Sequence, residues 1–398
     1  MAYFRQWFKD FRDSFVSDFK AIFSDGGVLI IFIVAGLLYP ILFNLIYRNG
    51  VLEDEKIAVV DMAACSESRR YIRELDATRE LKVEYRCASM EEAERLMQQR
   101  KVNGIVLFPS DYGEKLARME TATISIYADM SSFLYYKNLM MGTNFVMLDE
   151  MHSIEIERAE TSGMTHREAE LSAQPVLYEE NNPYNRTFSY SIFFLSAALM
   201  LVIQQTMCYG MSLLAGTMRE EKRSFALQAK GMNPRGVGRL VAGRGLAYWL
   251  LYMAIAMYIA FLVPAMFGLP QRGNFWDILL LLIFFVTDCV FFSMTWSSIF
   301  TKRETVFLLF LCFSPIALFL TGFSWPMSAA PHFWKLFSYI FPTSFACPAF
   351  INLNTAGADL VIVKDLFRGM LVQTMVYCAL AFAAVYIENF ILAKKGEE

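Results

Sequence analysis

The chain has 398 residues, of which 56% are hydrophobic, and its mean hydropathy is positive. This is too apolar for one soluble globular protein of this size, in which about 45–50% is usual. The formal net charge of −3 identifies no partner, and we expect no nucleic acid among the partners. Charged residues crowd into 1–25, 48–180 and 217–244, which is typical of a polytopic membrane protein with one large soluble insert.

Residues 1–25 are predicted to form an amphipathic helix. In the segment YFRQWFKDFRDSFVSDFKAIF, residues 3–23, aromatic and aliphatic residues recur at steps of three and four, with charged residues mostly between them. Because these apolar residues are periodic rather than continuous, the segment is not a signal peptide. An aromatic face suits the cytoplasmic membrane interface, and the apolar run that follows favours this over a helix packed on a soluble core.

Six apolar runs are each close to or above the roughly 20 residues that span a bilayer. The short connections on one side are basic, notably residues 217–244, here named the basic segment, and Lys302-Arg303. Short basic loops stay in the cytoplasm, so both termini are expected to be cytoplasmic in a plasma (bacterial inner) membrane, with residues 48–187 extracytoplasmic. The predicted spans are 28–46, 188–216, 245–267, 275–300, 306–323 and 370–392.

Residues 48–187 are predicted to form a folded domain. Short apolar runs at 56–61, 81–86, 104–109 and 123–128 alternate with segments of helical pattern, which favours a small α/β domain. Residues 131–170 follow as one predicted long helix. Cys65 and Cys87 both lie in this domain, and whether they pair depends on the compartment and on their geometry.

Residues 324–368 are apolar but are interrupted by four prolines, at 326, 331, 342 and 348. The pieces between these prolines are too short to cross a bilayer. We therefore expect short re-entrant or interfacial helices on the extracytoplasmic side. The expected fold class is a mostly α polytopic membrane protein with six transmembrane helices and an α/β extracytoplasmic domain inserted between helices 1 and 2.

Three motifs follow one another along this topology. The first is the pattern of the inserted domain, with IAVVD at 57–61, EEAERLMQQRKVNGIVLFPSDYGEKL at 91–116 and TISIYAD at 123–129. The second is REEKRSFALQAKGMNPRG at 219–236, and the third is TGFSWPMSAAPHFWKLFSYIFPTSF at 321–345. Together they resemble the permease subunits of the ABC-2 type exporter family.

The resemblance implies an export permease that works as a dimer with a second copy or a paralogue. It also implies two cytoplasmic ABC ATPase subunits, which bind ATP and magnesium, and contact with membrane lipid. It is compatible with a periplasmic adaptor protein as a further partner. The sequence itself contains no Gly-x-x-x-x-Gly-Lys-Ser/Thr phosphate loop, so we expect neither ATP hydrolysis nor a cofactor in this chain. Its three histidines lack catalytic or metal-ligand spacing, and we expect no catalytic residue and no metal site.

The basic segment is the candidate site of coupling to the ATPase. A topology signal alone explains its Lys and Arg residues but not its two glutamates. The apolar residues that follow them indicate an interfacial helix that presents a surface, which favours coupling over the topology signal. The candidate coupling residues are Arg219, Glu220, Glu221, Lys222, Arg223, Phe225, Leu227 and Lys230.

Three polar residues inside predicted spans are candidates for a substrate path. Asp288 lies halfway along the fourth span, where a carboxylate costs roughly 2.5–3.5 kcal/mol on insertion scales, so it is expected to face protein or water. It either lines the path or carries a proton, or it makes a hydrogen bond between helices. Gln204 and Gln205 in the second span are path candidates too, although packing between helices is the favoured interpretation for them.

Two functions fit these observations. The first is a permease that exports an amphiphilic or hydrophobic substrate. The second is a protein that transmits ATPase-driven mechanical work to an envelope partner without transport. A purely mechanical protein needs no polar path, so Asp288 and the two glutamines favour transport. A membrane enzyme would need clustered His, Asp or Ser near one membrane face, and the short loops carry no such cluster.

Overall fold

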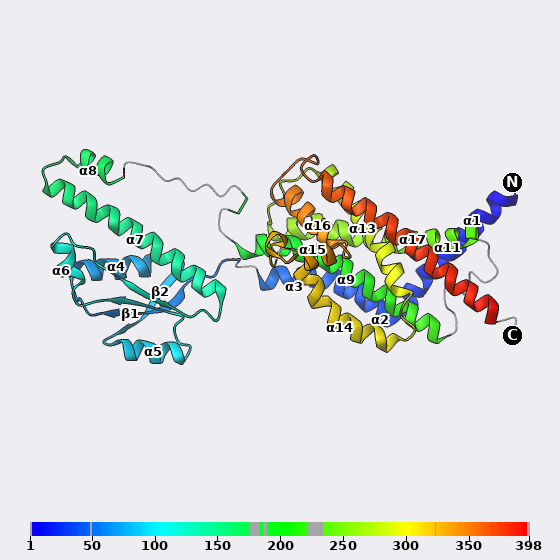
Figure 1. The fold of residues 1–398 in the computed structure, drawn as a ribbon, viewed down its shortest axis with the longest axis horizontal. Coiled ribbons are helices and arrows are strands. Elements are labelled where there is room, and N and C mark those ends of the chain that lie inside the picture. Colours follow the sequence, from blue (N-terminus) through cyan, green and yellow to red (C-terminus); the bar gives the residue numbers. More distant parts are fainter. Residues whose placement is uncertain are drawn as a thin grey trace. The chain divides into compact units, whose positions relative to one another are not determined.

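In a computed structural model of the chain, the structure describes residues 2–47, 50–174, 184–185, 189–221, 234–322 and 324–395. The chain divides into two compact units, drawn in Figure 1. The helical unit comprises Met1–Gly50 and Pro183–Glu398, and the α/β unit comprises Val51–Asn182. Each unit has its own hydrophobic core.

Most of the helical unit consists of long apolar helices joined by short connections. Its first part contains α1 (Ala2–Ser24), α2 (Gly26–Leu29), the π-helical turn η1 (Ile30–Ala35) and α3 (Gly36–Ile46). After the α/β unit come α9 (Tyr190–Glu220), α11 (Pro234–Met257), η2 (Tyr258–Leu262), α12 (Val263–Phe267), α13 (Phe275–Ser297) and α14 (Arg303–Leu320). The last part contains η3 (Met327–Ala329), α15 (His332–Ser338), α16 (Thr343–Phe350), η4 (Ile351–Thr355) and α17 (Lys364–Lys395).

Six helices of the described residues are long and apolar enough to cross a membrane, or up to seven if one bent pair counts as a single span. That pair, His332–Ser338 with Thr343–Thr355, bends by 88°, in the region where prolines interrupt the sequence. The six candidate spans are Gly26–Ile46, Ala198–Glu220, Pro234–Phe267, Phe275–Ser297, Arg303–Leu320 and Lys364–Phe390.

The helix α9 lies at the centre of the helical unit. It packs against α13, α14 and α16, and also against the first candidate span. In its apolar stretch 83% of the residues are buried inside the protein, compared with 22% for Gly26–Ile46 and 18% for Arg303–Leu320. Gly26–Ile46 and Arg303–Leu320 therefore present most of their apolar side chains to the surroundings, as a bilayer permits.

Two helices extend into the basic segment further than its composition suggests. The helix α9 continues to Glu220, and α11 already begins at Pro234. Arg235, Arg239 and Arg244 consequently lie on the first turns of α11 and not in a loop. The hydropathy of a span marks where it meets lipid, whereas a helix ends where its backbone hydrogen bonds end, so the two boundaries need not coincide.

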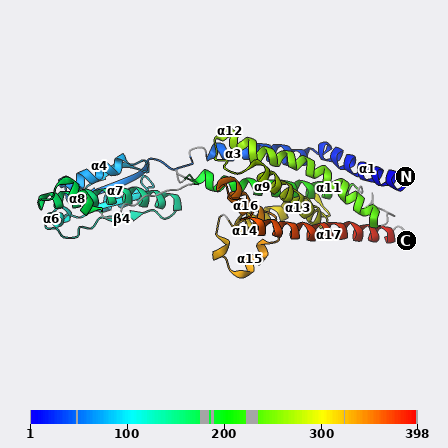
Figure 2. The same cartoon turned by 90° about the horizontal axis from the view of Figure 1, so that it is seen from above.

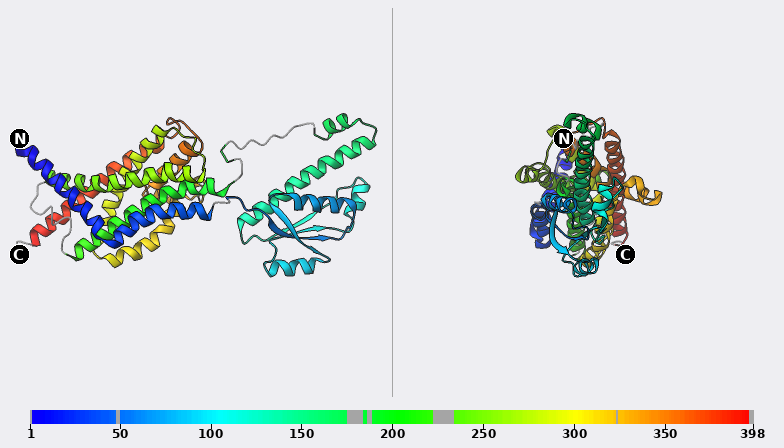
Figure 3. Two further views of the ribbon diagram at one scale, coloured as in Figure 1. Left: turned by 180° about the vertical axis from the view of Figure 1, so that it is seen from behind. Right: turned by 90° about the vertical axis from the view of Figure 1, so that its left-hand side faces the viewer.

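The α/β unit is built on a four-stranded sheet with strand order β2-β1-β3-β4. β1 pairs in parallel with both β2 and β3, and β4 pairs antiparallel with β3. Apolar side chains of the strands point alternately to the two faces of the sheet. The helices α4 and α7 pack on one face and α5 on the other, which Figure 3 shows from behind. The elements are β1 (Glu55–Asp61), α4 (Ser66–Ala77), β2 (Leu81–Cys87), α5 (Met90–Gln98), β3 (Gly104–Phe108), α6 (Tyr112–Ala117), β4 (Ser125–Ala128), α7 (Phe133–Thr161) and α8 (His166–Ala173).

The expected long helix over 131–170 is two helices in the structure. α7 ends at Thr161, and Gly163 takes a φ of 95°, which is open to glycine but strained for other residues. Thr165 then starts α8 with a capping box, since its side chain and that of Glu168 each bind the other's backbone N–H. Cys65 and Cys87 are both free thiols in the structure.

A buried acid in the α/β unit predicts a pH-dependent stability. Glu55, at the start of β1, is 4% exposed and its carboxyl oxygens accept no hydrogen bond from the described residues. Burial raises its pKa to about 8, from 4.5 in an exposed side chain. Between these values the folded chain binds more protons than the unfolded chain, so the free energy of unfolding falls as pH rises.

We expect Glu55→Gln to remove this decline and to make the α/β unit more stable than wild type near pH 8. Hydrogen exchange of the β1 amides in the full chain, compared between variants at one pH, measures the difference. The matched control is Glu53→Gln, because Glu53 is half exposed and pairs with Arg79. If the β1 amides of wild type and Glu55→Gln are equally protected at pH 8, the ionisation of Glu55 does not cause the loss of stability.

Candidate functional site

Three of the eight candidate coupling residues are described by the structure. Arg219 and Glu220 form the end of α9, and Glu221 is an exposed turn residue directly after it. The other five, Lys222, Arg223, Phe225, Leu227 and Lys230, lie outside the described residues. What the structure defines is how the two flanks of the basic segment are held.

Arg219 lies in the last turn of α9 and joins three helices. The end of α9 lies at the end of the helical unit that carries both termini (Figure 1). Its guanidinium pairs with Glu388 of α17 through a fork of two hydrogen bonds, Nε to Oε1 at 3.2 Å and Nη2 to Oε2 at 2.8 Å. Its Nη1 also donates to the carbonyl oxygens of Ser297, at 3.0 Å, and Phe300. These carbonyls lie where α13 ends, so a single side chain ties α9, α13 and α17 together.

A second junction lies beside the first and involves Glu220. Its carboxylate accepts a hydrogen bond from the backbone N–H of Arg303, at the start of α14. The Arg303 guanidinium in turn binds Asp25, with Nη1 to Oδ2 at 2.9 Å, and Thr217 of α9. Asp25 caps α2 by accepting from the backbone N–H groups of Gly27 and Val28.

The carboxyl of Asp25 stays ionised at this junction. Burial raises its pKa, but the hydrogen bonds from Val28 and Gly27 and the guanidinium of Arg303 outweigh burial, so the pKa is lowered overall. The start of the first candidate span is therefore tied to α9 and α14 by a charged contact. Sequence reasoning missed Asp25, Arg303 and Glu388 as partners, because only the fold brings them together.

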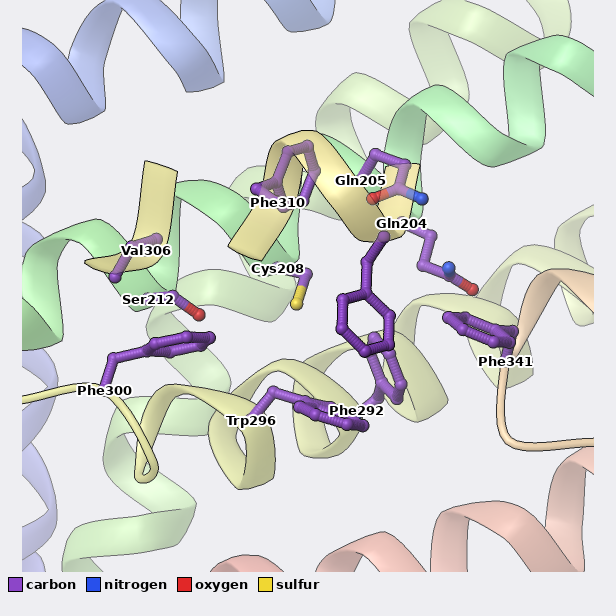
Figure 4. Close-up of a pocket in the computed structure, with 11 residues that line it drawn as sticks. Gln204, Gln205, Cys208, Ser212, Phe292, Trp296, Phe300, Val306, Phe310 and Phe341 are labelled. Carbon is purple, nitrogen blue, oxygen red and sulfur yellow. The ribbon is translucent and has the colours of Figure 1, made fainter. Parts of the chain in front are cut away.

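Gln204 and Gln205 both line a partly open cavity of about 40 Å³ between α9, α13 and α14 (Figure 4). Gln204 also accepts a hydrogen bond from the backbone N–H of Thr343 at 2.9 Å, so it fixes the start of α16 as well. The other lining residues are mostly aromatic and include no charged side chain. They are Cys208, Ser212, Phe292, Trp296, Phe300, Val306, Phe310, Phe313 and Phe341.

The size of this cavity bears on what it can bind. Pockets for drug-sized ligands measure about 300–1,000 Å³, so the cavity as it stands holds water-sized groups only. Its wall on one side is α14, most of which faces outward. Outward movement of α14 would enlarge the space between it and α9. The lining would then offer aromatic faces and two amides to a largely uncharged ligand.

Asp288 is not among the residues that line the cavity. It is fully buried on α13. Its carboxyl lies beside the Thr374 hydroxyl of α17, and α13 and α17 pack along one another. Both interpretations, a proton-carrying group and a hydrogen bond between helices, are compatible with this position.

The described residues contain no group of three or more His, Cys, Asp or Glu side chains that could hold a metal ion. Six helices of the described residues that are long and apolar enough to span a bilayer indicate an integral membrane protein. Residues 27–390 match the family model described as "ABC-2 family transporter protein". The chain belongs to this family, whose members are membrane transport components and normally work with a cytoplasmic ATPase subunit. No curated protein matches the chain.

We expect Arg219→Ala to destabilise the helical unit by roughly 2 kcal/mol. This is less than the roughly 3–5 kcal/mol for one partner of a fully buried pair, because the side chains of Arg219 and Glu388 are 16% and 29% exposed. The melting temperature in detergent measures the loss. Adding Glu388→Ala to Arg219→Ala should cost less than Glu388→Ala alone. Strict additivity of the two losses would contradict the pairing.

Proposed function

We propose that the chain is the permease subunit of an ABC exporter that moves an amphiphilic or hydrophobic substrate out of the cytoplasm or the inner leaflet. Energy comes from a separate ATPase subunit that binds ATP and magnesium. The observation that carries the proposal is the junction at Arg219 and Glu220, where one flank of the basic segment is fastened to α13, α14 and α17. A push on the basic segment then acts on several spans at once.

The proposed orientation follows from the charges. Arg219, Arg239 and Arg303 belong to the end of α9, the first turns of α11 and the start of α14. These helix ends lie at the end of the helical unit that carries both termini (Figure 1). This end is taken as cytoplasmic because short basic connections stay inside. The α/β unit, which follows the first candidate span, is then extracytoplasmic. The membrane is proposed to be a bacterial inner membrane.

Transport is proposed to use the cavity between α9 and α14. The helix α9 is central and tied down, whereas α14 is held mainly along one side. Movement of α14 would widen the cavity until it accepts substrate, and return would close it. The absence of charge among the lining residues and the number of aromatic rings favour neutral or weakly polar cargo.

We propose that the permease acts as a dimer with a second copy or a paralogue. The outward faces of Gly26–Ile46 and Arg303–Leu320 are apolar and little buried in the single chain. Such faces can be covered by lipid or by a second permease chain. ABC ATPases work in pairs, and a permease dimer would offer one permease chain to each ATPase subunit.

The second candidate function, mechanical transmission to an envelope partner, is favoured by one feature of the α/β unit. The helix α7 exposes Phe145, Leu148 and Met151, at 48%, 58% and 51%. An exposed apolar face on a soluble unit marks an interaction surface. A periplasmic adaptor protein is the partner that the proposed orientation permits, and it is compatible with transport as well.

The proposed coupling predicts an ATPase that copurifies with the chain. We expect purification in mild detergent from the native membrane to recover a soluble ATPase with a phosphate-loop motif. Glu220→Arg should loosen it or uncouple its activity from the permease, since the reversal breaks the contact with the Arg303 backbone and places two cations side by side. Glu304→Arg, the same change on α14 beyond this junction, is the control. Recovery of the chain without an ATPase would refute the proposal.

A filled cavity distinguishes transport from mechanical transmission. Val306 lines the cavity from α14 and is 1% exposed, so Val306→Phe should occupy the space and block export while the ATPase stays bound. Leu308→Phe, on the exposed side of the same helix at 65% exposure, should leave export unchanged. If Val306→Phe leaves export intact, the cavity is not the path. If the variant has no export to block but still acts on an envelope partner, mechanical transmission is favoured.

A further inference from the structure

The helix α1 has two faces of opposite character. Phe8, Phe19 and Phe23 are exposed along one face. On the opposite face Ser14 and Asp18 are 2% and 1% exposed, and Asp10 precedes them by one turn with a side chain that is 11% exposed. Steps of four residues place Asp10, Ser14 and Asp18 in one stripe. An interfacial helix that only rests on the membrane has no reason to bury two carboxylates.

The polar stripe of α1 packs along the first turns of α11 (Figure 2). Arg239 Nη1 donates to Asp10 Oδ2 at 3.0 Å. The Ser14 hydroxyl donates to the Leu240 carbonyl oxygen, also at 3.0 Å. Arg244 Nε lies 3.7 Å from Asp18 Oδ1. Three consecutive turns of α1 are therefore matched to α11.

Glycine allows this close approach. A Cβ atom at Gly243 would lie 2.5 Å from the Phe11 carbonyl oxygen, a distance that real Cβ atoms do not adopt. The backbones of α1 and α11 thus touch between the two ion pairs. Contacts of this kind make the pair of helices move as one body.

The two helices lead to different places along the chain. The helix α11 begins at Pro234, directly after residues 222–233 of the basic segment. The helix α1 ends at Ser24, and Asp25 then caps α2 at the start of the first candidate span. A displacement of the start of α11 is therefore passed to the first span by way of α1.

We propose that Asp10 and Asp18 are positioning residues, which hold α1 against the start of α11 so that movement of the basic segment reaches the first span. The inference rests on the proposed function, because it takes the basic segment as the contact with the ATPase. It assigns α1 a role beyond that of a membrane-surface helix.

The outer pair, Asp10 with Arg239, is the better one to test. Asp18 lies 3.7 Å from Arg244, which is too long for a direct hydrogen bond, and burial raises the pKa of its carboxyl. Asp10 and Arg239 are joined by a direct hydrogen bond. Asp13 provides a matched control, because it lies on the same helix with a half-exposed side chain and forms an ion pair with its neighbour Arg12, away from α11.

The experiment measures hydrogen exchange in the full complex with its ATPase, with and without magnesium, ATP and vanadate. In wild type we expect nucleotide to change exchange in residues 222–233 and in residues 24–46. Asp10→Arg and Arg239→Asp should each abolish the change in 24–46 and keep the change in 222–233. The double exchange Asp10→Arg with Arg239→Asp should restore it, and Asp13→Arg should have no effect. Asp10→Asn serves as a milder variant if Asp10→Arg does not fold.

The outcomes separate the two proposals. If nucleotide leaves residues 222–233 of the wild type unchanged, the basic segment is not the ATPase contact and the proposed function fails. If 222–233 responds but 24–46 responds equally in Asp10→Arg or Asp10→Asn, the positioning role of α1 is wrong. A uniform loss of protection in every variant, Asp13→Arg included, would also overturn it, because a specific pair cannot explain that result.

Discussion

The structure depends on a constraint that the bilayer imposes on charged groups. A guanidinium or carboxylate inside a bundle of membrane helices must find its partner within the protein, because lipid provides none. The end of the helical unit that carries both termini meets this constraint with contacts between helices. Arg219 binds Glu388 and two carbonyls, Arg303 binds Asp25, and Arg239 binds Asp10. Each contact fixes the end of one helix against another, and the pair of Arg239 with Asp10, at 10% and 11% exposure, is the least screened by water of the three.

The same unit is held much less firmly around its cavity. The lining between α9 and α14 is mostly aromatic, and Gln204 accepts its hydrogen bond from the Thr343 backbone N–H and not from α14 across the cavity. Dispersion contacts between rings have many nearly equivalent arrangements, whereas a forked ion pair has one. Helices can therefore separate at the cavity while their ends stay fixed. This contrast suits a protein in which a rigid end moves as a lever and a soft interior opens.

The features predictable from the sequence are those that depend on neighbours along the chain. Runs of apolar residues predicted the spans, and alternation predicted the four strands, since both periods are local. The ion pairs depend on tertiary structure, and no local pattern gives them: Arg219 and Glu388 are 169 positions apart, and Asp25 and Arg303 are 278 apart. The periodicity of the segment predicted the helix α1, which the structure shows. The sequence does not reveal the acidic stripe of α1 as a contact surface, because its partner α11 is far away along the chain. The break at Gly163 was missed because one glycine in a polar helical pattern is a weak signal.

The charged contacts at the two flanks of the basic segment lead to different helices. The flank at Arg219 and Glu220 is bound to α13, α14 and α17, and the flank that begins at Pro234 is bound to α1, while α11 also packs against α13 and α17. Both sets of contacts lead to the junction at Asp25, since α1 ends just before it and the carboxylate that caps α2 also binds the first residue of α14. In the proposed mechanism, a push on the basic segment would therefore act on this junction from both sides. Because α14 forms one wall of the cavity, we propose this junction as the mechanical link between the basic segment and the cavity.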